Sequence, residues 1–180
     1  MRVIKKGWTR VLFFIPVRYY IVHWFRFFKD LVGQAYPSIP PAIYIDDSYE
    51  NDVITWEHEL QHIRQWILSL GLSIHLPDEL LEVDAHVFAI VKYAKKRKIR
   101  KNDYTTWHFL ISRASSSLEK NGLNRFKTQK YLERKLEKIL GLDFSYKAQK
   151  KALEKKRRRY KTGFPRHSES LDYFRLCFRR

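Results

Sequence analysis

The chain has 180 residues, of which 36 are lysine or arginine and 19 are aspartate or glutamate, so its net charge is +17. This length suits one domain with a modest core, and so large a positive charge favours polyanionic partners. The single cysteine, Cys177, excludes an intramolecular disulfide, and no stretch resembles a cleavable signal peptide, so we expect a cytoplasmic location.

The stretch from Trp8 to Phe28 is dense in valine, isoleucine and aromatic residues. Arg10, Arg18 and Arg26 interrupt it at every eighth residue, and Pro16 breaks any continuous helix. A membrane-spanning helix needs about 20 apolar residues with few charges, so a membrane span is not expected. We favour a strand or short helix that forms core behind the next helix. An interfacial anchor, which aromatic residues beside arginines would suit, is the lesser alternative.

A helix is predicted after a proline-rich connector at residues 35–41 and a short β-type run at residues 42–46. Residues that favour helix starts cluster from Asp46 to Ser48, and Gly71 stands where a C′ glycine would end the helix. Between these limits, apolar residues recur at helical spacing and predict one buried stripe, formed by Val53, Trp56, Leu60, Ile63, Ile67 and Leu70.

The polar face of this helix carries the pattern H-E-x-x-H, with His58, Glu59 and His62. Residues four apart lie one turn apart on the same face, so both imidazoles can reach one Zn²⁺ at about 2.0–2.1 Å. Glu59 then stands where it can take a proton from a zinc-bound water. Gln65 and Glu57 are candidates for orienting the imidazoles. The alternative is an ordinary amphipathic helix with solvent-facing histidines.

A catalytic zinc takes three protein ligands and a water, so a third ligand must come from elsewhere in the chain. A second helix is predicted from residue 77 onward, and Glu82 lies twenty positions after His62, enough chain for a turn and a returning helix. Ala85 and Ala89 share the face of Glu82 and would let the two helices approach closely. Glu82 is therefore the favoured third ligand. The alternatives are Glu79, Asp84 and His86.

These motifs resemble the small gluzincin-type metallopeptidases of bacteria and phages. The family pattern is H-E-x-x-H-x-x-Q, followed on a later helix by E-x-[DE]-A. Here the first part runs from His58 to Gln65 and the second from Glu82 to Ala85, and the resemblance covers roughly residues 40–92. The chain departs from the pattern at His86, where some relatives carry aspartate or an aromatic residue.

The resemblance implies zinc on His58, His62 and Glu82, with Glu59 as the base, in a zincin-like domain at residues 1–100. It also implies that the β-type run at residues 42–46 lies along the substrate cleft and offers its edge to an extended peptide. Ordinary core packing is an equal alternative for that run. The expected substrate is a protein or peptide.

The second half of the chain is strongly basic. Residues 30–91 carry one basic residue against eleven acidic ones, whereas residues 92–180 carry 28 basic residues against eight acidic ones. Helices are predicted at residues 105–120, 128–140 and 145–161, and we expect a basic helical extension over residues 101–180. The run from Lys147 to Lys161 has nine lysines and arginines and a single acid. It is either a solvated helix face or a non-specific contact for nucleic acid or an anionic surface.

The sequence thus predicts an α+β protein, mostly α, that hydrolyses peptide bonds with water activated by zinc and Glu59. A further donor usually stabilises the oxyanion in such a reaction, and the candidates are His86, Tyr93, Tyr104 and His108. Two other functions remain open. The chain could be a nucleic-acid-associated protein with a structural or lost zinc site, or a phage accessory protein whose zincin-like fold serves interaction alone.

Overall fold

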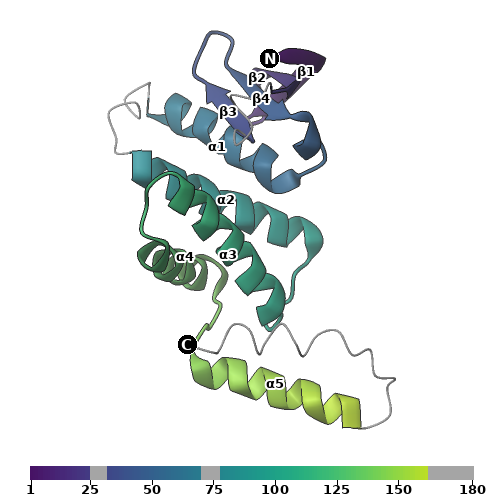
Figure 1. Cartoon of the computed structure of the whole chain (residues 1–180), viewed down its shortest axis with the longest axis vertical. Coiled ribbons are helices and arrows are strands. Elements are labelled where there is room, and N and C mark those ends of the chain that lie inside the picture. Colours follow the sequence, from purple (N-terminus) through teal and green to yellow (C-terminus); the bar gives the residue numbers. More distant parts are fainter. Residues whose placement is uncertain (25–31, 70–77, 162–180) are drawn as a thin grey trace. The chain divides into compact units, whose positions relative to one another are not determined.

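The computed structural model describes residues 1–24, 32–69 and 78–161 (Figure 1). The chain is α+β and mostly α, as the sequence predicts, with a four-stranded sheet and five α-helices in this part. It divides into two compact units, Met1–Leu142 and Asp143–Arg180, which are described separately. No helix in the described ranges is both long and apolar enough to cross a membrane.

The sheet has the strand order β1-β2-β4-β3, with β1 at Arg2–Val11, β2 at Ile15–His23, β3 at Gly33–Tyr36 and β4 at Ala42–Asp46. β1 is antiparallel to β2, and β4 runs parallel to β2 and antiparallel to β3. The β-type run at residues 42–46 is therefore a strand, but it lies inside the sheet and cannot offer an edge. The exposed edge beside it belongs to β3, whose last two residues were expected to be part of the connector.

The N-terminal strands supply core, as predicted for the stretch after Trp8. Val11 and Val17 are almost completely buried and cluster with Ile43 of β4. Leu60 and Ile63, from the apolar stripe of the motif helix, complete this cluster. Because residues alternate between the two faces of a strand, the same strands also carry exposed side chains on the opposite face.

The motif helix, α1, spans Val53–Leu68 and begins later than the sequence suggests. Its N-cap is Asp52, whose carboxylate accepts hydrogen bonds from the backbone N–H and the hydroxyl of Thr55. The expected cap region instead forms a single 3₁₀ turn, Asp47–Tyr49, which has its own cap at Asp46. The predicted stop at Gly71 lies outside the described residues.

Three further helices complete the first unit: α2 at Asp78–Arg97, α3 at Tyr104–Lys120 and α4 at Arg125–Leu140. Figure 1 shows the sheet, α1, α2 and the pair α3–α4 in successive layers. Gly141 ends α4 in the left-handed conformation at φ 61°, as its predicted stop position requires. Fully buried side chains such as Trp107 and Leu132 anchor α3 and α4.

The boundary between the two units differs from the expected one at residue 100. α3 and α4 pack with α2 and belong to the first unit, because their apolar faces are buried there. The second unit contains α5 at Tyr146–Lys161. Its lysines Lys147, Lys150 and Lys151 are exposed, whereas the side chains of residues 155–161 and all of Cys177 lie outside the described part.

Candidate metal centre

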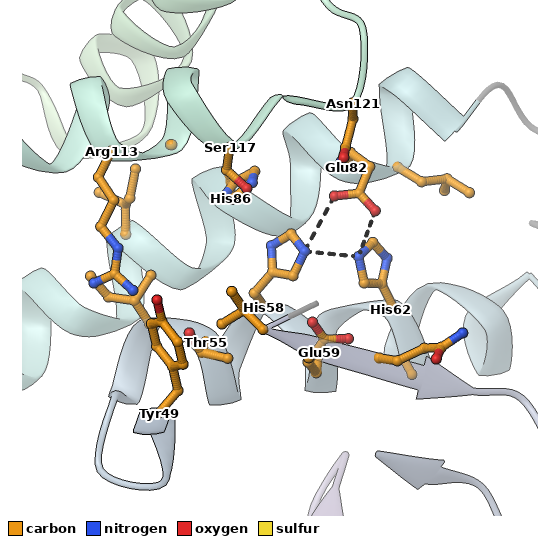
Figure 2. Close-up of a pocket in the computed structure, with 18 of the residues that line it drawn as sticks. Tyr49, Thr55, His58, Glu59, His62, Glu82, His86, Arg113, Ser117 and Asn121 are labelled. Carbon is orange, nitrogen blue, oxygen red and sulfur yellow. Dashed lines mark hydrogen bonds and ion pairs between the residues drawn. The ribbon is translucent and has the colours of Figure 1, made fainter. Parts of the chain in front are cut away.

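The two histidines of the motif and Glu82 meet between α1 and α2 (Figure 2). The Nε2 atoms of His58 and His62 lie 3.1 Å apart, as expected for side chains one helical turn apart. One carboxylate oxygen of Glu82 lies 3.3 Å from Nε2 of His58, and the other lies 3.3 Å from Nε2 of His62. The three side chains therefore bring two imidazole nitrogens and the two oxygens of one carboxylate close together.

The separations at this site are of the size found between the ligands of a tetrahedral metal ion. Ligand atoms at about 2.0–2.1 Å from a tetrahedral Zn²⁺ are separated by about 3.3–3.4 Å from one another. The two Nε2 atoms lie 3.1 Å apart, and each lies 3.3 Å from a different oxygen of Glu82, which is close to that spacing. Two imidazoles and one carboxylate are also the donor set of catalytic zinc sites that keep a fourth position for water. The residues present therefore fit a zinc ion.

His86 lies next to this centre and is a rival ligand. One ligand atom from each of His58, Glu82 and His86 can be chosen so that all three lie within 4.8 Å of one another, so this trio could also hold a metal ion. The Nε2 atom of His86 is buried and has no hydrogen-bond partner among the described residues. His86 is therefore a second candidate ligand, beside His62, for an ion held by His58 and Glu82.

The other two alternative ligands lie elsewhere. Glu79 is exposed at the start of α2, and Asp84 is an exposed residue that accepts hydrogen bonds from Gln61 and Gln65. Ala85 and Ala89, the two small residues that share the face of Glu82, are both completely buried.

Gln65 orients His62. Its Nε2 donates to the backbone oxygen of Leu81 at 3.0 Å and to the carboxylate of Asp84 at 3.1 Å. These two acceptors fix the amide so that Oε1 faces Nδ1 of His62, 3.0 Å away. An amide oxygen only accepts, so Nδ1 of His62 carries the proton and Nε2 keeps its lone pair for the metal. Glu57, the other candidate, instead lies 3.5 Å from Arg64.

Glu59 is buried against the edge strand of the sheet. Only 7% of its surface is exposed, and β3 passes close to it at Gly33. A Cβ atom at Gly33 would stand 2.6 Å from Oε1 of Glu59, so only glycine fits without displacing this carboxylate. Burial raises the pKa of Glu59, against the opposing charges of His58 and His62. A raised pKa suits a carboxylate that accepts and returns a proton near neutral pH.

Glu82 and His62 shift each other's pKa in opposite directions. Burial alone would raise the pKa of Glu82, but the hydrogen bonds from His58 and His62 outweigh it and hold that pKa well below its usual range. Burial alone would lower the pKa of His62, yet Glu82 outweighs it and raises that pKa. Burial, with the nearby charge of His58, lowers the pKa of His86 to about 3, so this imidazole is neutral at pH 7.

These residues line a pocket of about 1030 Å³ that β3, α1, α2 and α3 enclose. His86 is the only one of the four expected oxyanion donors among its lining residues, whereas Tyr93, Tyr104 and His108 are not. Other elements also contribute lining residues, and no local motif in the sequence marks them. Figure 2 labels four of these: Tyr49, Arg113, Ser117 and Asn121.

Arg113 ties α3 to the start of α1. Both of its terminal nitrogens donate to the two carboxylate oxygens of Asp52, the residue that caps α1. Burial alone would raise the pKa of Asp52, but Arg113 and Thr55 outweigh it and lower that pKa. The cap thus stays ionised, and a residue 61 positions away in sequence holds the first turn of the motif helix.

Comparisons of the chain with models of protein families, with curated proteins and with solved structures found no match. The resemblance to gluzincin-type peptidases therefore stays a prediction from the two motifs. The only other support for a function of this site is the geometry of its own residues.

Proposed function

We propose that this protein is a zinc-dependent peptidase of the gluzincin type. The observation that supports this most directly is the meeting of His58, His62 and Glu82, where the two Nε2 atoms lie 3.1 Å apart and each lies 3.3 Å from one oxygen of the carboxylate. Glu59, the residue after the first ligand, is buried beside them and has a raised pKa. A metal with three protein ligands and an acid–base carboxylate is the minimum set for metal-assisted hydrolysis.

Each residue has one role in this proposal. Zinc, when bound, supplies a Lewis acid that polarises a carbonyl and lowers the pKa of a water to about 7. Glu59 accepts the proton of the attacking water at its carboxylate and then returns it to the leaving amine. His86, neutral and with an unpaired buried nitrogen, donates a hydrogen bond to the oxygen on which charge develops.

The edge strand β3 is the proposed binding place for an extended peptide. β3 pairs with β4 on one side only among the described strands, and Gly33, Gln34 and Ala35 line the pocket. A peptide that adds to this edge gains backbone hydrogen bonds and runs past Glu59. The resemblance implies that residues 42–46 bind the substrate at their strand edge. We propose that β3 binds it instead, because β4 is a central strand.

The experiment is a comparison of Glu59→Gln with Glu57→Gln. Neither residue is a proposed ligand, and both lie on α1, so both variants should keep stoichiometric zinc and the melting temperature of the wild type. Glu59→Gln should lower hydrolysis of a mixed peptide library by about 10²–10⁴-fold, because it removes the proton acceptor at nearly constant shape. Glu57→Gln should cleave like the wild type, since Glu57 faces Arg64.

Two outcomes would overturn the proposal. The first is wild-type protein, purified without chelator and dialysed against zinc, that holds no metal. The second is a Glu59→Gln variant that cleaves peptides as fast as the wild type.

A second function rests on α5 in the other unit. Lys147, Lys150 and Lys151 are exposed on this helix, where the run up to Lys161 has a single acid, Glu154. A surface of this kind attracts phosphate backbones with little dependence on sequence. We propose that α5 contacts nucleic acid in this non-specific way.

A further inference from the structure

The end of the sheet that carries the β1–β2 turn exposes bulky apolar side chains. Phe13 and Phe14, in the turn between the two strands, are 96% and 75% exposed. Ile39, in the connector before β4, is 94% exposed. Such exposure is unusual for side chains of this size, and all three belong to one unit.

The strand register places these three residues at the same end of the sheet. Val11 pairs with Ile15, so the turn at residues 12–14 closes the hairpin at that end. β4 runs parallel to β2 and begins opposite Arg18, whose backbone N–H donates to the oxygen of Pro41. The connector that holds Ile39 therefore enters β4 from the turn side. Phe13, Phe14 and Ile39 are called the apolar tip below.

The backbone of the turn would suit smaller residues. Leu12 and Phe13 have φ angles of 49° and 68°, in the left-handed region that glycine and asparagine prefer. Bulky residues in this conformation cost folding free energy, and such outliers are associated with functional sites. The turn therefore has large side chains at positions where its backbone conformation favours glycine or asparagine.

Positive charge surrounds the hairpin behind the tip. Arg10 and Arg18 are exposed, and Arg18 stacks on the ring of Trp8, which is 58% exposed. The first 29 residues contain no aspartate or glutamate. The acidic residues near the sheet lie at its opposite end, where Asp46 ends β4 and Glu50 pairs with Lys5.

We propose that the apolar tip inserts into the interface of an anionic lipid membrane. Aromatic side chains on a protruding turn enter the boundary between headgroups and acyl chains, and the arginines behind them meet anionic headgroups. The charge is of one sign and the tip protrudes, which fits a lipid surface better than a pocket on a partner protein. This inference is independent of the metal and of peptide hydrolysis.

The test measures co-sedimentation of the full-length protein with vesicles of phosphatidylcholine and phosphatidylserine. Phe13→Ser with Phe14→Ser should weaken binding by at least about tenfold, because the interface no longer buries two aromatic side chains. Arg10→Gln with Arg18→Gln should weaken it by about fivefold per charge at low salt. The matched control is Phe126→Ser on α4, which removes a side chain that is 86% exposed but stands away from the tip.

The basic helix α5 could also bind these vesicles, so the comparison is repeated with Lys147, Lys150 and Lys151 all changed to glutamine. The weakening caused by the two serines should persist in that background. The proposal is overturned if the wild type does not bind vesicles, if the two serines leave binding unchanged, or if Phe126→Ser weakens it equally. Unchanged vesicle binding together with loss of a protein partner would assign the tip to a protein interface instead.

Discussion

The α1–α2 pair and α5 use ionisable side chains in opposite ways. Two histidines and Glu82 meet between α1 and α2, and Glu59 of α1 is buried against β3, so that the charges of these groups and their burial shift the pKa values of Glu59, His62 and Glu82. On α5, the described lysines stand in solvent along a run that contains a single acid. Ionisable groups that lie close together out of water have shifted pKa values, which suits proton transfer and metal binding. Separate charges in water attract oppositely charged partners at long range.

The largest expected effect is on the metal itself. Glu82→Gln should abolish stoichiometric zinc after dialysis, because it removes the anionic ligand, whereas Glu79→Gln should leave zinc content unchanged. Elemental analysis of the two purified variants measures this difference. Loss of zinc in His86→Ala but not in His62→Ala would instead assign the ion to His58, Glu82 and His86.

The next effect concerns the residue that orients a ligand. Gln65→Ala should weaken zinc binding by about 10–100-fold, because His62 loses the acceptor that fixes its tautomer. Gln61→Ala is the matched control, since Gln61 also bonds to Asp84 but does not bond to either histidine. Competition with a chromogenic chelator gives both affinities. Equal weakening in the two variants would show that Asp84, rather than the histidine, mediates the effect.

The protonation of His62 makes zinc binding depend on pH. Its folded-state pKa is raised above 6.5, so a proton competes with the metal at higher pH than for an isolated histidine. Zinc affinity should therefore fall by up to about tenfold per pH unit once the pH drops below that raised pKa. Without zinc the sign reverses, because a raised pKa stabilises the fold below 6.5 and this contribution is lost as the pH rises through the folded-state value.

Thermal melts of the two forms across this pH range test the sign directly. The zinc-loaded protein should gain stability over the metal-free protein as the pH rises. A constant difference between the two forms would mean that no ligand titrates in this window.

The smallest effect is expected on the basic helix. Changing Lys147, Lys150 and Lys151 to glutamine should reduce the slope of log K against log salt for duplex DNA by about 0.9 for each phosphate that the helix no longer neutralises. Zinc content and peptide cleavage should not change. Fluorescence anisotropy at several salt concentrations measures the slope. An unchanged slope would leave these lysines as a solvated face, and a loss of zinc would mean that they act on the first unit.

Local features of the structure were predictable from the sequence. α3, α4 and α5 begin within three residues of their predicted starts and end at the predicted residues, because caps, glycine stops and periodicity are short-range signals. His58 and His62 meet for the same reason. Glu82 was predictable as their neighbour, since a returning helix packs against α1 and the small residues on the face of Glu82 are buried.

Long-range features could not be predicted in this way. Which strand forms the edge depends on the order in which the strands pair. The apolar sequence of β4 is compatible with either an edge or a central position, so it does not reveal that β4 is central. The bond from Arg113 to Asp52 joins positions 61 residues apart, with no motif at either end. The predicted start of α1 was too early, because Asp46 and Asp52 are equally suitable N-cap residues. Asp46 caps the 3₁₀ turn, and Asp52 caps α1.

The close approach of Gly33 to Glu59 also restricts how this sequence can change over time. A methyl group at position 33 would stand 2.6 Å from a carboxylate oxygen that is itself buried, so position 33 cannot gain a side chain while Glu59 keeps its place. Among descendants that keep the glutamate, selection should preserve glycine at position 33. In lineages where the glutamate has been replaced by a smaller side chain, that position should drift to alanine or serine. Covariation of these two positions would mark which homologues have kept the carboxylate that the proposed hydrolysis needs.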